Sequence, residues 1–180
     1  MLEDELLKLR FKAGRADALE RIYEKYRDTL LTLAMQLLND AEAAEDVVQD
    51  VFVAFARAGE TFGLRGRLRS YLATCVVNRV RDLARARKRR GPVVTLEAHA
   101  PLEADSAPPD GRLVSNEQSR LVARALARLP EEQREVIALR LNGQLKMREI
   151  ATLQHVPLTT VRGRYRHGIH RLRSILNGRL

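Results

Sequence analysis

MREIATLQHVPLTTVRGRYRHGIHRLR, residues 147–173, decides the fold, because it joins a short helix with an apolar face to a longer and strongly basic helix. Pro157 pushes the residue before it out of the α region, and His155 is of a type that tolerates the left-handed conformation of a turn. Thr159 or Thr160 can then cap the second helix. The inner face of that helix is spaced as Val161, Tyr165, Ile169, Leu172 and Leu176. This pattern predicts a helix-turn-helix unit.

The outer face of the second helix is cationic. It carries Arg162, Arg164, Arg166, His167, His170, Arg171 and Arg173. No acidic residue follows Glu149, whereas a solvated helix usually interleaves both signs to form pairs one turn apart. One interpretation is an ordinary arginine-rich surface helix. The one-sided charge favours a helix that enters the DNA major groove with its guanidinium groups toward phosphates and base edges.

Composition supports a nucleic-acid partner without identifying it. The 180 residues carry a formal net charge of +9 and have an isoelectric point near 10.4, and such values favour binding to phosphate backbones. Residues 116–180 hold 13 Lys/Arg against 5 Asp/Glu, whereas residues 91–115 hold 1 against 4. A single cysteine, Cys75, excludes an internal disulfide and suits a reducing compartment. Because we find neither a signal peptide nor an apolar run of roughly 20 residues, we expect a cytoplasmic protein with no membrane segment.

Residues 91–115, GPVVTLEAHAPLEADSAPPDGRLVS, interrupt the helical periodicity. They contain four of the six prolines and are weakly acidic, which is typical of a flexible linker. The segment separates residues 1–90 from residues 116–180, and no alternation in either part predicts a strand. The sequence therefore predicts an all-α protein with two small helical domains joined by a flexible linker, the second a helix-turn-helix domain.

Apolar residues recur at helical spacing through most of residues 1–90. Asp17 followed by Glu20 has capping-box spacing and predicts the start of a helix that ends near Asn39. Further helices are expected over residues 41–57 and 68–89. A short first helix is marked by Leu2, Leu6 and Leu9. The inward residues of the helix over 41–57 are predicted to be Ala44, Val47, Val48, Val51, Phe52 and Phe55.

The opposite face of the helix over 41–57 is acidic. It shows Glu42, Glu45, Asp46, Gln49 and Asp50. Three interpretations are open: a carboxylate metal site, a plainly solvated face, or a docking face for a basic protein. A metal site would need inward ligands from other helices, and residues 1–90 contain no histidine.

A loop with two glycines and a basic helix follow. Phe62 lies in the loop, and seven of the twelve residues from Arg79 to Arg90 are Lys or Arg. Aromatic side chains beside a cationic helix suit single-stranded nucleic acid, because the rings stack on bases while guanidinium groups contact the backbone. The alternative for Tyr71 is a core tyrosine with its hydroxyl at the rim.

These motifs occur in a recognisable order. The acidic segment EDVVQDVFVAFA (45–56) comes first, and the loop and LRSYLATCVVNRVRDLARARKRR (68–90) follow it. After the linker come LPEEQREVIALRLNGQLKMREIA (129–151) and VPLTTVRGRYRHGIHRLR (156–173). In this order and spacing the chain resembles the bacterial RNA polymerase sigma factors of the small extracytoplasmic-function (ECF) class. The resemblance covers nearly the whole chain outside the linker and the extreme ends.

The resemblance implies a promoter-specificity subunit that binds core polymerase, then recognises and melts promoter DNA. Docking on the clamp of the largest subunit would use Glu45, Asp46, Gln49 and Asp50. The downstream element and a flipped base would be bound by Phe62, Arg65, Tyr71, Asn78, Arg79, Arg81 and Arg85. The upstream element, about two DNA turns away, would be read by Thr159, Thr160, Arg162, Gly163, Arg164, Arg166 and His167.

The resemblance also implies partners beyond the clamp and promoter DNA. The second domain would contact the flap of the second-largest polymerase subunit, and an anti-sigma protein is a possible restraint. No cofactor or metal is implied. The chain departs from the common family pattern at four positions. Tryptophan is frequent in place of Tyr71, and glycine in place of His155. An apolar residue is frequent in place of Gln154, and serine in place of Gly163.

Two other classes of protein stay open from the residues alone. A stand-alone helix-turn-helix transcriptional regulator would need the same basic helix but neither the acidic face nor the melting loop. An enzyme is not indicated, because no nucleophile–base pair, metal-ligand spacing or phosphate-cradling glycine loop is present.

Overall fold

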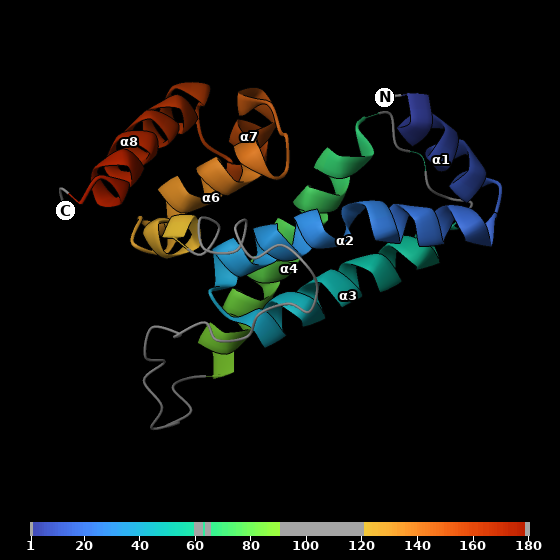
Figure 1. The fold of residues 1–180 in the computed structure, drawn as a ribbon. Coiled ribbons are helices and arrows are strands. Elements are labelled where there is room, and N and C mark those ends of the chain that lie inside the picture. The colour runs from blue at the N-terminus through green and yellow to red at the C-terminus, as the bar shows by residue number, and fades with distance from the viewer. Residues whose placement is uncertain (1, 60–62, 64–65, 91–120, 179–180) are drawn as a thin grey trace.

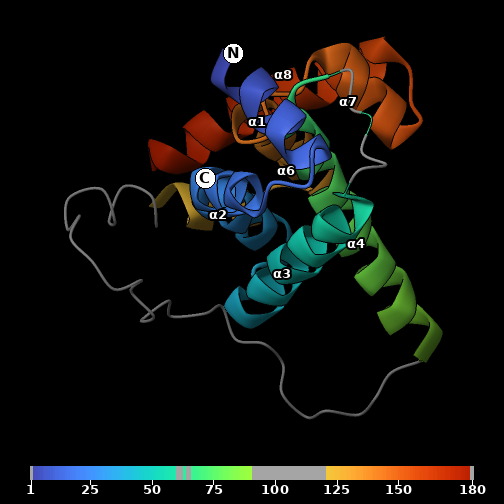
Figure 2. The same cartoon turned by 90° about the vertical axis from the view of Figure 1, so that its right-hand side faces the viewer.

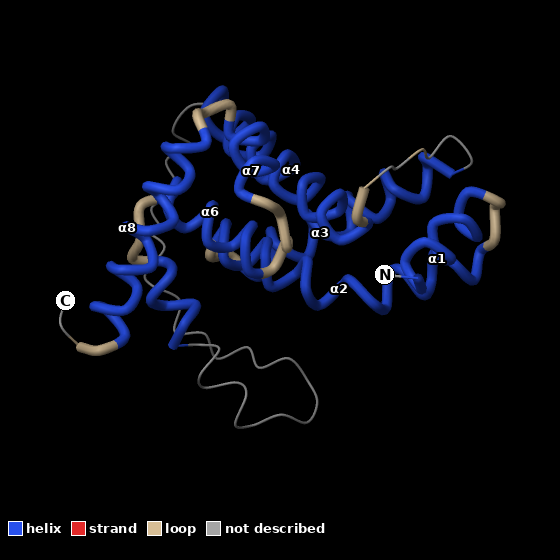
Figure 3. The backbone as a smooth tube through the Cα atoms, turned by 90° about the horizontal axis from the view of Figure 1, so that it is seen from above, coloured by secondary structure: helices blue, strands red, loops and turns tan. Residues whose placement is uncertain are grey.

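The computed structural model describes residues 2–59, 63, 66–90 and 121–178. These residues form helices and loops only (Figures 1 and 3). The helices are α1 (Leu2–Lys12), α2 (Ala16–Leu38), α3 (Ala41–Ala58), α4 (Leu68–Arg90), α6 (Glu131–Leu141), α7 (Met147–Gln154) and α8 (Leu158–Leu176), and residues 121–127 are also helical. The predicted linker, residues 91–115, lies outside the described residues, as do Phe62 and Arg65. The prediction of an all-α chain with a helix-turn-helix is confirmed.

α3 forms the apolar centre of the first unit. All six residues predicted to point inward are buried: Ala44, Val47, Val48, Val51, Phe52 and Phe55. They pack against α2 on one side and α4 on the other. Phe55 also stacks on Phe11 of α1, with ring centroids 4.3 Å apart, so α1 is part of the same core.

The ends of α2 and α3 follow backbone chemistry that the sequence indicated only in part. Asn39 ends α2 in the left-handed conformation, with φ 54°, and the Asp40 carboxylate accepts from the Ala43 N–H at 3.1 Å to cap α3. The predicted capping box of Asp17 and Glu20 is wrong. α2 begins at Ala16 with no side-chain cap, and Asp17 stands in its first turn, where a carboxylate favours the helix dipole instead.

α1 docks through few side chains. Leu2, Leu6 and Leu9, whose spacing indicated this helix, are all exposed, because Leu7 and Phe11 take the inward side. Polar contacts complete the docking: Asp4 accepts from the Tyr26 hydroxyl at 2.7 Å and from Lys25 Nζ at 2.8 Å. Burial raises the pKa of Asp4, but these two hydrogen bonds outweigh it and hold the pKa below its usual range. Burial raises the pKa of Tyr26, and the hydrogen bond to the same carboxylate raises it further.

The second unit is the predicted helix-turn-helix. His155 ends α7 with φ 53°, which confirms the left-handed turn. Its core joins α6 and α8 to residues 121–129 through Ile137, Leu172 and Leu126. The Thr159 or Thr160 cap is wrong, since α8 already begins at Leu158 after Pro157 and both threonines lie in its first turn. Leu176, which was expected on the inner face of the second helix, is exposed.

The two units lie against each other. α6 packs on α2, and one buried cluster contains Leu139 and Leu145 of the second unit together with Leu33, Ala73 and Val77 of the first. Two perpendicular views show α6, α7 and α8 on one side of α2 and α3 on the other (Figures 1 and 2). The acidic helix therefore faces away from the second unit.

Two glycines of α8 offer a matched stability test. A Cβ at Gly168 would come within 2.8 Å of Ile137 Cδ1 and 3.2 Å of Gln133 Cβ, whereas a Cβ at Gly163 would meet nothing within 4 Å. Because Ile137 is fully buried, Gly168→Ala should cost roughly 1 kcal/mol net of the gain in helix propensity. Gly163→Ala should gain up to about 1 kcal/mol, or about 2–4 °C in Tm. Thermal unfolding followed by circular dichroism would show opposite shifts; shifts of the same sign would contradict this packing.

Candidate protein and nucleic-acid interfaces

The predicted docking residues lie on the outer face of α3. Glu45, Asp46, Gln49 and Asp50 are all exposed. Asp50 differs from the other three, because its carboxylate pairs with Arg79 of α4, with Oδ2 2.6 Å from Nη2 and 2.8 Å from Nε. The structure thus places the first three on a free acidic surface and turns Asp50 toward the basic helix.

Beside this acidic surface lies a groove that the sequence did not reveal. It lies between α2 and α3, has a volume of about 680 Å³ and is bordered by Glu45 and Gln49. Its apolar lining includes Leu19, Tyr23, Leu31, Val48, Phe52 and Val53. Tyr23 and Val53 are 40% and 43% exposed. One feature of the sequence does indicate this groove. The apolar residues of α2 cover a wider arc than a single buried stripe requires, because Leu19 and Tyr23 accompany Ile22 and Tyr26.

The predicted downstream-element residues of α4 divide between two sides of that helix. Tyr71, Asn78 and Arg79 line a hollow of about 440 Å³ between α3 and α4, together with Cys75 and Asp82. Tyr71 is half-buried, and burial followed by the contact with Cys75 raises the pKa of its hydroxyl. Arg85 is exposed and pairs with Asp82 at 2.5 Å.

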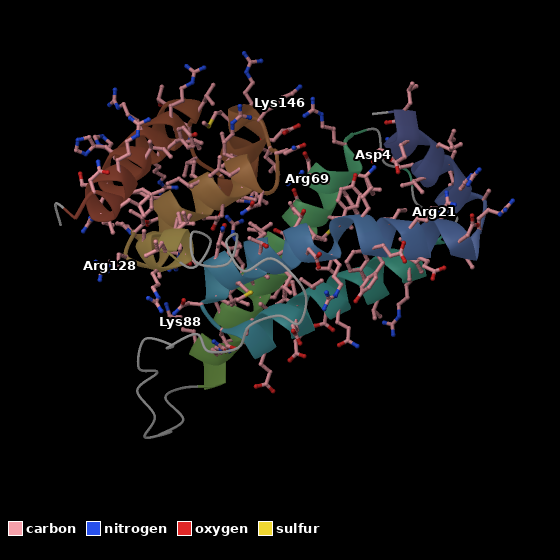
Figure 4. The ribbon with its side chains drawn as sticks, in the orientation of Figure 1. Asp4, Arg21, Arg69, Lys88, Arg128 and Lys146 are labelled. Carbon is pink, nitrogen blue, oxygen red and sulfur yellow. The ribbon has the colours of Figure 1, made fainter. Side chains whose placement is uncertain are left out.

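Arg81 is not part of this hollow. It points toward the second unit, where Nη2 donates to Glu135 Oε1 at 2.7 Å and Nη1 donates to the Leu153 carbonyl at 2.8 Å. Arg69, at the start of α4, also faces the second unit (Figure 4), and its Nε donates to the Asn142 carbonyl at 2.6 Å.

The residues predicted to read the upstream element lie on the N-terminal half of α8. The exposed members are Thr159, Thr160, Arg162, Arg166 and His167. Arg164 is half-buried, and its Nη1 donates to Gln154 Oε1 of α7 at 2.9 Å. Gly163 is also half-buried, with open space where a Cβ would lie. The first turn of α8 contains no acidic residue, so this half of the helix presents hydroxyl groups, cations and backbone to its surroundings.

Other kinds of site find no support in the part of the chain that the structure describes. There, no group of three or more His, Cys, Asp and Glu side chains is arranged to hold a metal ion. None of the helices described is long and apolar enough to span a membrane.

Comparison with known proteins places both units in one family. The family model described as Sigma-70 region 2 matches residues 22–90, and the model described as Sigma-70, region 4 matches residues 119–172. RNA polymerase sigma-H factor of Pseudomonas aeruginosa is 30% identical over 90% of this chain and 88% of its own length. ECF RNA polymerase sigma factor SigW of Bacillus subtilis is 27% identical over 92% of both chains.

Solved structures share the fold. CnrH, solved in complex with the cytosolic domain of CnrY, superimposes with a TM-score of 0.66 at 23% identity, over 97% of each chain. The sigma factor RpoE of Bartonella quintana, solved with the anti-sigma factor NepR, also gives a TM-score of 0.66 at 23% identity, over 88% of this chain and 96% of that one.

Region 2 and region 4 on one chain define a sigma factor of RNA polymerase. The chain belongs to the extracytoplasmic-function (ECF) class of that family. It is a promoter-specificity subunit, with core RNA polymerase and promoter DNA as partners.

Proposed function

We propose that the chain binds the polymerase clamp through α3 and reads the two promoter elements through α4 and α8. The observation that carries this assignment is the separation of charge in space. The exposed carboxylates of Glu45 and Asp46 lie on the side of α2 away from the second unit, whereas the exposed guanidinium groups of Arg162 and Arg166 lie on α8. A protein partner and a nucleic-acid partner can therefore bind at once.

The docking surface combines charge with an apolar groove. Glu45 and Gln49 belong both to the acidic face and to the rim of the groove between α2 and α3. Exposed apolar side chains flanked by carboxylates suit a partner helix that carries an apolar stripe edged by Lys and Arg. We assign the clamp of the largest subunit to this surface, with Tyr23 and Val53 as additional contacts.

The hollow between α3 and α4 suits the downstream element. Tyr71 supplies a ring for stacking and Asn78 supplies an amide that can donate to and accept from a base edge. Asp50 neutralises Arg79 at the same place, so shape and hydrogen bonding contribute more there than net charge. Phe62 and Arg65, outside the described residues, are proposed to complete this site.

The second unit reads the upstream element with α8 in the major groove. The N-terminal half of that helix is the part that contacts base edges in helix-turn-helix proteins. It carries Thr159, Thr160, Arg162, Gly163 and Arg166. Arg164 and His167 flank them. The whole assignment is tested by reconstitution with bacterial core polymerase and run-off transcription from candidate promoters.

We further propose that the chain acts in the cytoplasm, performs no catalysis of its own and is restrained by a protein. The two related structures support the last point, since CnrH was solved with the cytosolic domain of CnrY and RpoE with the anti-sigma factor NepR. The groove beside α3 is a surface that such a partner could cover.

Reversing charge on α3 should prevent docking. Asp46→Lys combined with Glu45→Lys places cations where the partner supplies cations, so the affinity for core polymerase should fall at least about tenfold, or ~1.4 kcal/mol. Glu24→Lys is the control, because the Glu24 side chain is exposed on α2 and lies outside the lining of the groove. Affinity would be measured with labelled chain and purified core; equal binding by the α3 variant and the control would refute the docking assignment.

Removing one arginine of α8 should change the salt dependence of DNA binding. For holoenzyme bound to a duplex selected from a random library, Arg162→Ala should reduce the slope of log affinity against log salt by about 1 if the contact is to phosphate. A base contact would instead cost about 1–3 kcal/mol and relax specificity at one position. Arg128 projects away from α8 (Figure 4), so Arg128→Ala should change neither quantity. An unaffected Arg162→Ala would remove α8 as the reader.

Gly163→Ala should weaken DNA binding while it stabilises the protein. Because the added methyl group meets nothing in the free chain, any loss of affinity must arise in the complex, where the glycine lets backbone and DNA approach closely. We expect a loss of about tenfold in the same holoenzyme assay. Unchanged or tighter binding would mean that this glycine has no role in DNA contact.

A further inference from the structure

One lysine of α1 lies on the buried side of that helix. Lys8 shares the inward face with Leu7 and Phe11 and is only 8% exposed. Within the described residues, Lys8 and Glu135 are the two charged residues that are buried. An apolar side chain at this position would dock α1 without the cost of desolvating an ammonium group. The lysine therefore indicates a role beyond docking.

The ammonium group of Lys8 binds the backbone just before α4. Its Nζ donates to the Gly66 carbonyl at 3.0 Å and pairs with Glu5 Oε1 at 2.7 Å. The Glu5 side chain is 65% exposed, so water screens that ion pair and can replace it. The bond to Gly66 joins α1 to a backbone group 58 positions away. It is therefore the contact that constrains the fold.

Gly66 stands where the loop passes into α4. That helix begins two residues later at Leu68, which is fully buried, and its first turn carries Tyr71. Arg65, proposed above to contact the downstream element, is the residue before Gly66 in the sequence. Because consecutive Cα atoms are about 3.8 Å apart, a bond that fixes Gly66 fixes the junction between the loop and the helix.

A second contact of α1 leads to the same place. Phe11 stacks on Phe55 of α3, and the centroid of the Phe55 ring lies 6.3 Å from that of Tyr71. Phe55 and Tyr71 both line the hollow between α3 and α4. α1 therefore supports this hollow at two points, through an aromatic ring in the core and through the backbone at the start of α4.

We propose that Lys8 is a positioning residue for the downstream element, which holds the start of α4 so that the hollow presents Tyr71 and Asn78 to a base in one geometry. The inference rests on the proposed function for the role of the hollow. Lys8 itself contacts no DNA, because its buried ammonium group is bound by protein oxygens. The region 2 match begins at residue 22 and assigns nothing to α1.

Base discrimination by the holoenzyme tests this role. The probe is a labelled single strand selected from a random library with wild-type holoenzyme, and it is compared with the same bases in scrambled order. Lys8→Met keeps the apolar stem but removes the ammonium group. Its affinity for the selected strand should fall roughly tenfold, because the site is no longer preorganised, while its affinity for the scrambled strand stays unchanged.

The comparison of the two strands excludes a simple effect of charge. If Lys8 only attracted phosphates, Lys8→Met would weaken both strands equally, and this outcome would refute the proposal. Lys12→Met is the matched control, because it removes the same charge from the exposed side of α1. It should keep the wild-type ratio of the two affinities.

Amide hydrogen exchange of the free chain, followed by NMR, separates positioning from folding. The Tyr71 amide donates to the Arg67 carbonyl at 3.1 Å, and in Lys8→Met it should exchange roughly tenfold faster because this first turn loses its anchor. The amides of α1 should stay protected, since Leu7 and Phe11 still dock that helix. Equal acceleration in α1, or none at Tyr71, would mean that Lys8 has no positioning role.

Rebuilding the ammonium group gives the converse test. Lys8→Cys, in a Cys75→Ser background, would be alkylated with 2-bromoethylamine while unfolded and then refolded, which restores a side chain close to lysine in length and charge. Circular dichroism would verify that both forms have the same helical content. Alkylation should restore the discrimination that Lys8→Cys lacks. Refolded, alkylated chain without discrimination would contradict the proposal.

Asn78→Ala in the same assay reports on the hollow alone. Unchanged discrimination by Asn78→Ala would remove the hollow as the site of the downstream element, and the proposed function would fail there. If Asn78→Ala loses discrimination while Lys8→Met retains it, the hollow keeps its function and only the role of Lys8 is refuted.

Discussion

The structure depends on α4, a single helix that packs against the core of the first unit, against the second unit and beside α3 at the same time. Leu72 and Val76 face the core of the first unit, while Ala73 and Val77 face the second unit within the same buried cluster. Asn78 lies on the remaining side, in the hollow beside α3. A helix with 3.6 residues per turn can divide its surface in this way only if the small residues stand where another helix approaches closely. Ala73 is that position, because the turn that follows α6 brings Gly143 directly against it.

This constraint explains which features the sequence could predict. The inward face of α3 was predicted in full, because one helix buried along one stripe gives a clean periodicity. The left-handed His155 was also predictable from local chemistry. The predicted starts of α2 and α8 were wrong. α2 begins before Asp17 and α8 begins before both threonines, so none of these side chains stands at the cap position.

The placement of the candidate site residues was harder to predict than the elements that carry them. Arg81 is one of seven basic residues between Arg79 and Arg90, and the sequence does not distinguish it from the others, yet its partner Glu135 is 54 positions away. Glu135 itself occurs in the charged stretch PEEQRE, where nothing marks it as buried. Contacts between distant segments are set by how the units pack, and a pattern within one helix does not contain that information. The groove beside α3 could not be predicted for the same reason, because its lining residues come from both α2 and α3.

Charge holds α4 to its neighbours in two different ways. The exposed Asp50–Arg79 pair links α3 to α4 within the first unit, and exposed pairs of this kind are worth ~0–1 kcal/mol, so it can exchange partners readily. The Arg81–Glu135 pair is more buried and resists exchange.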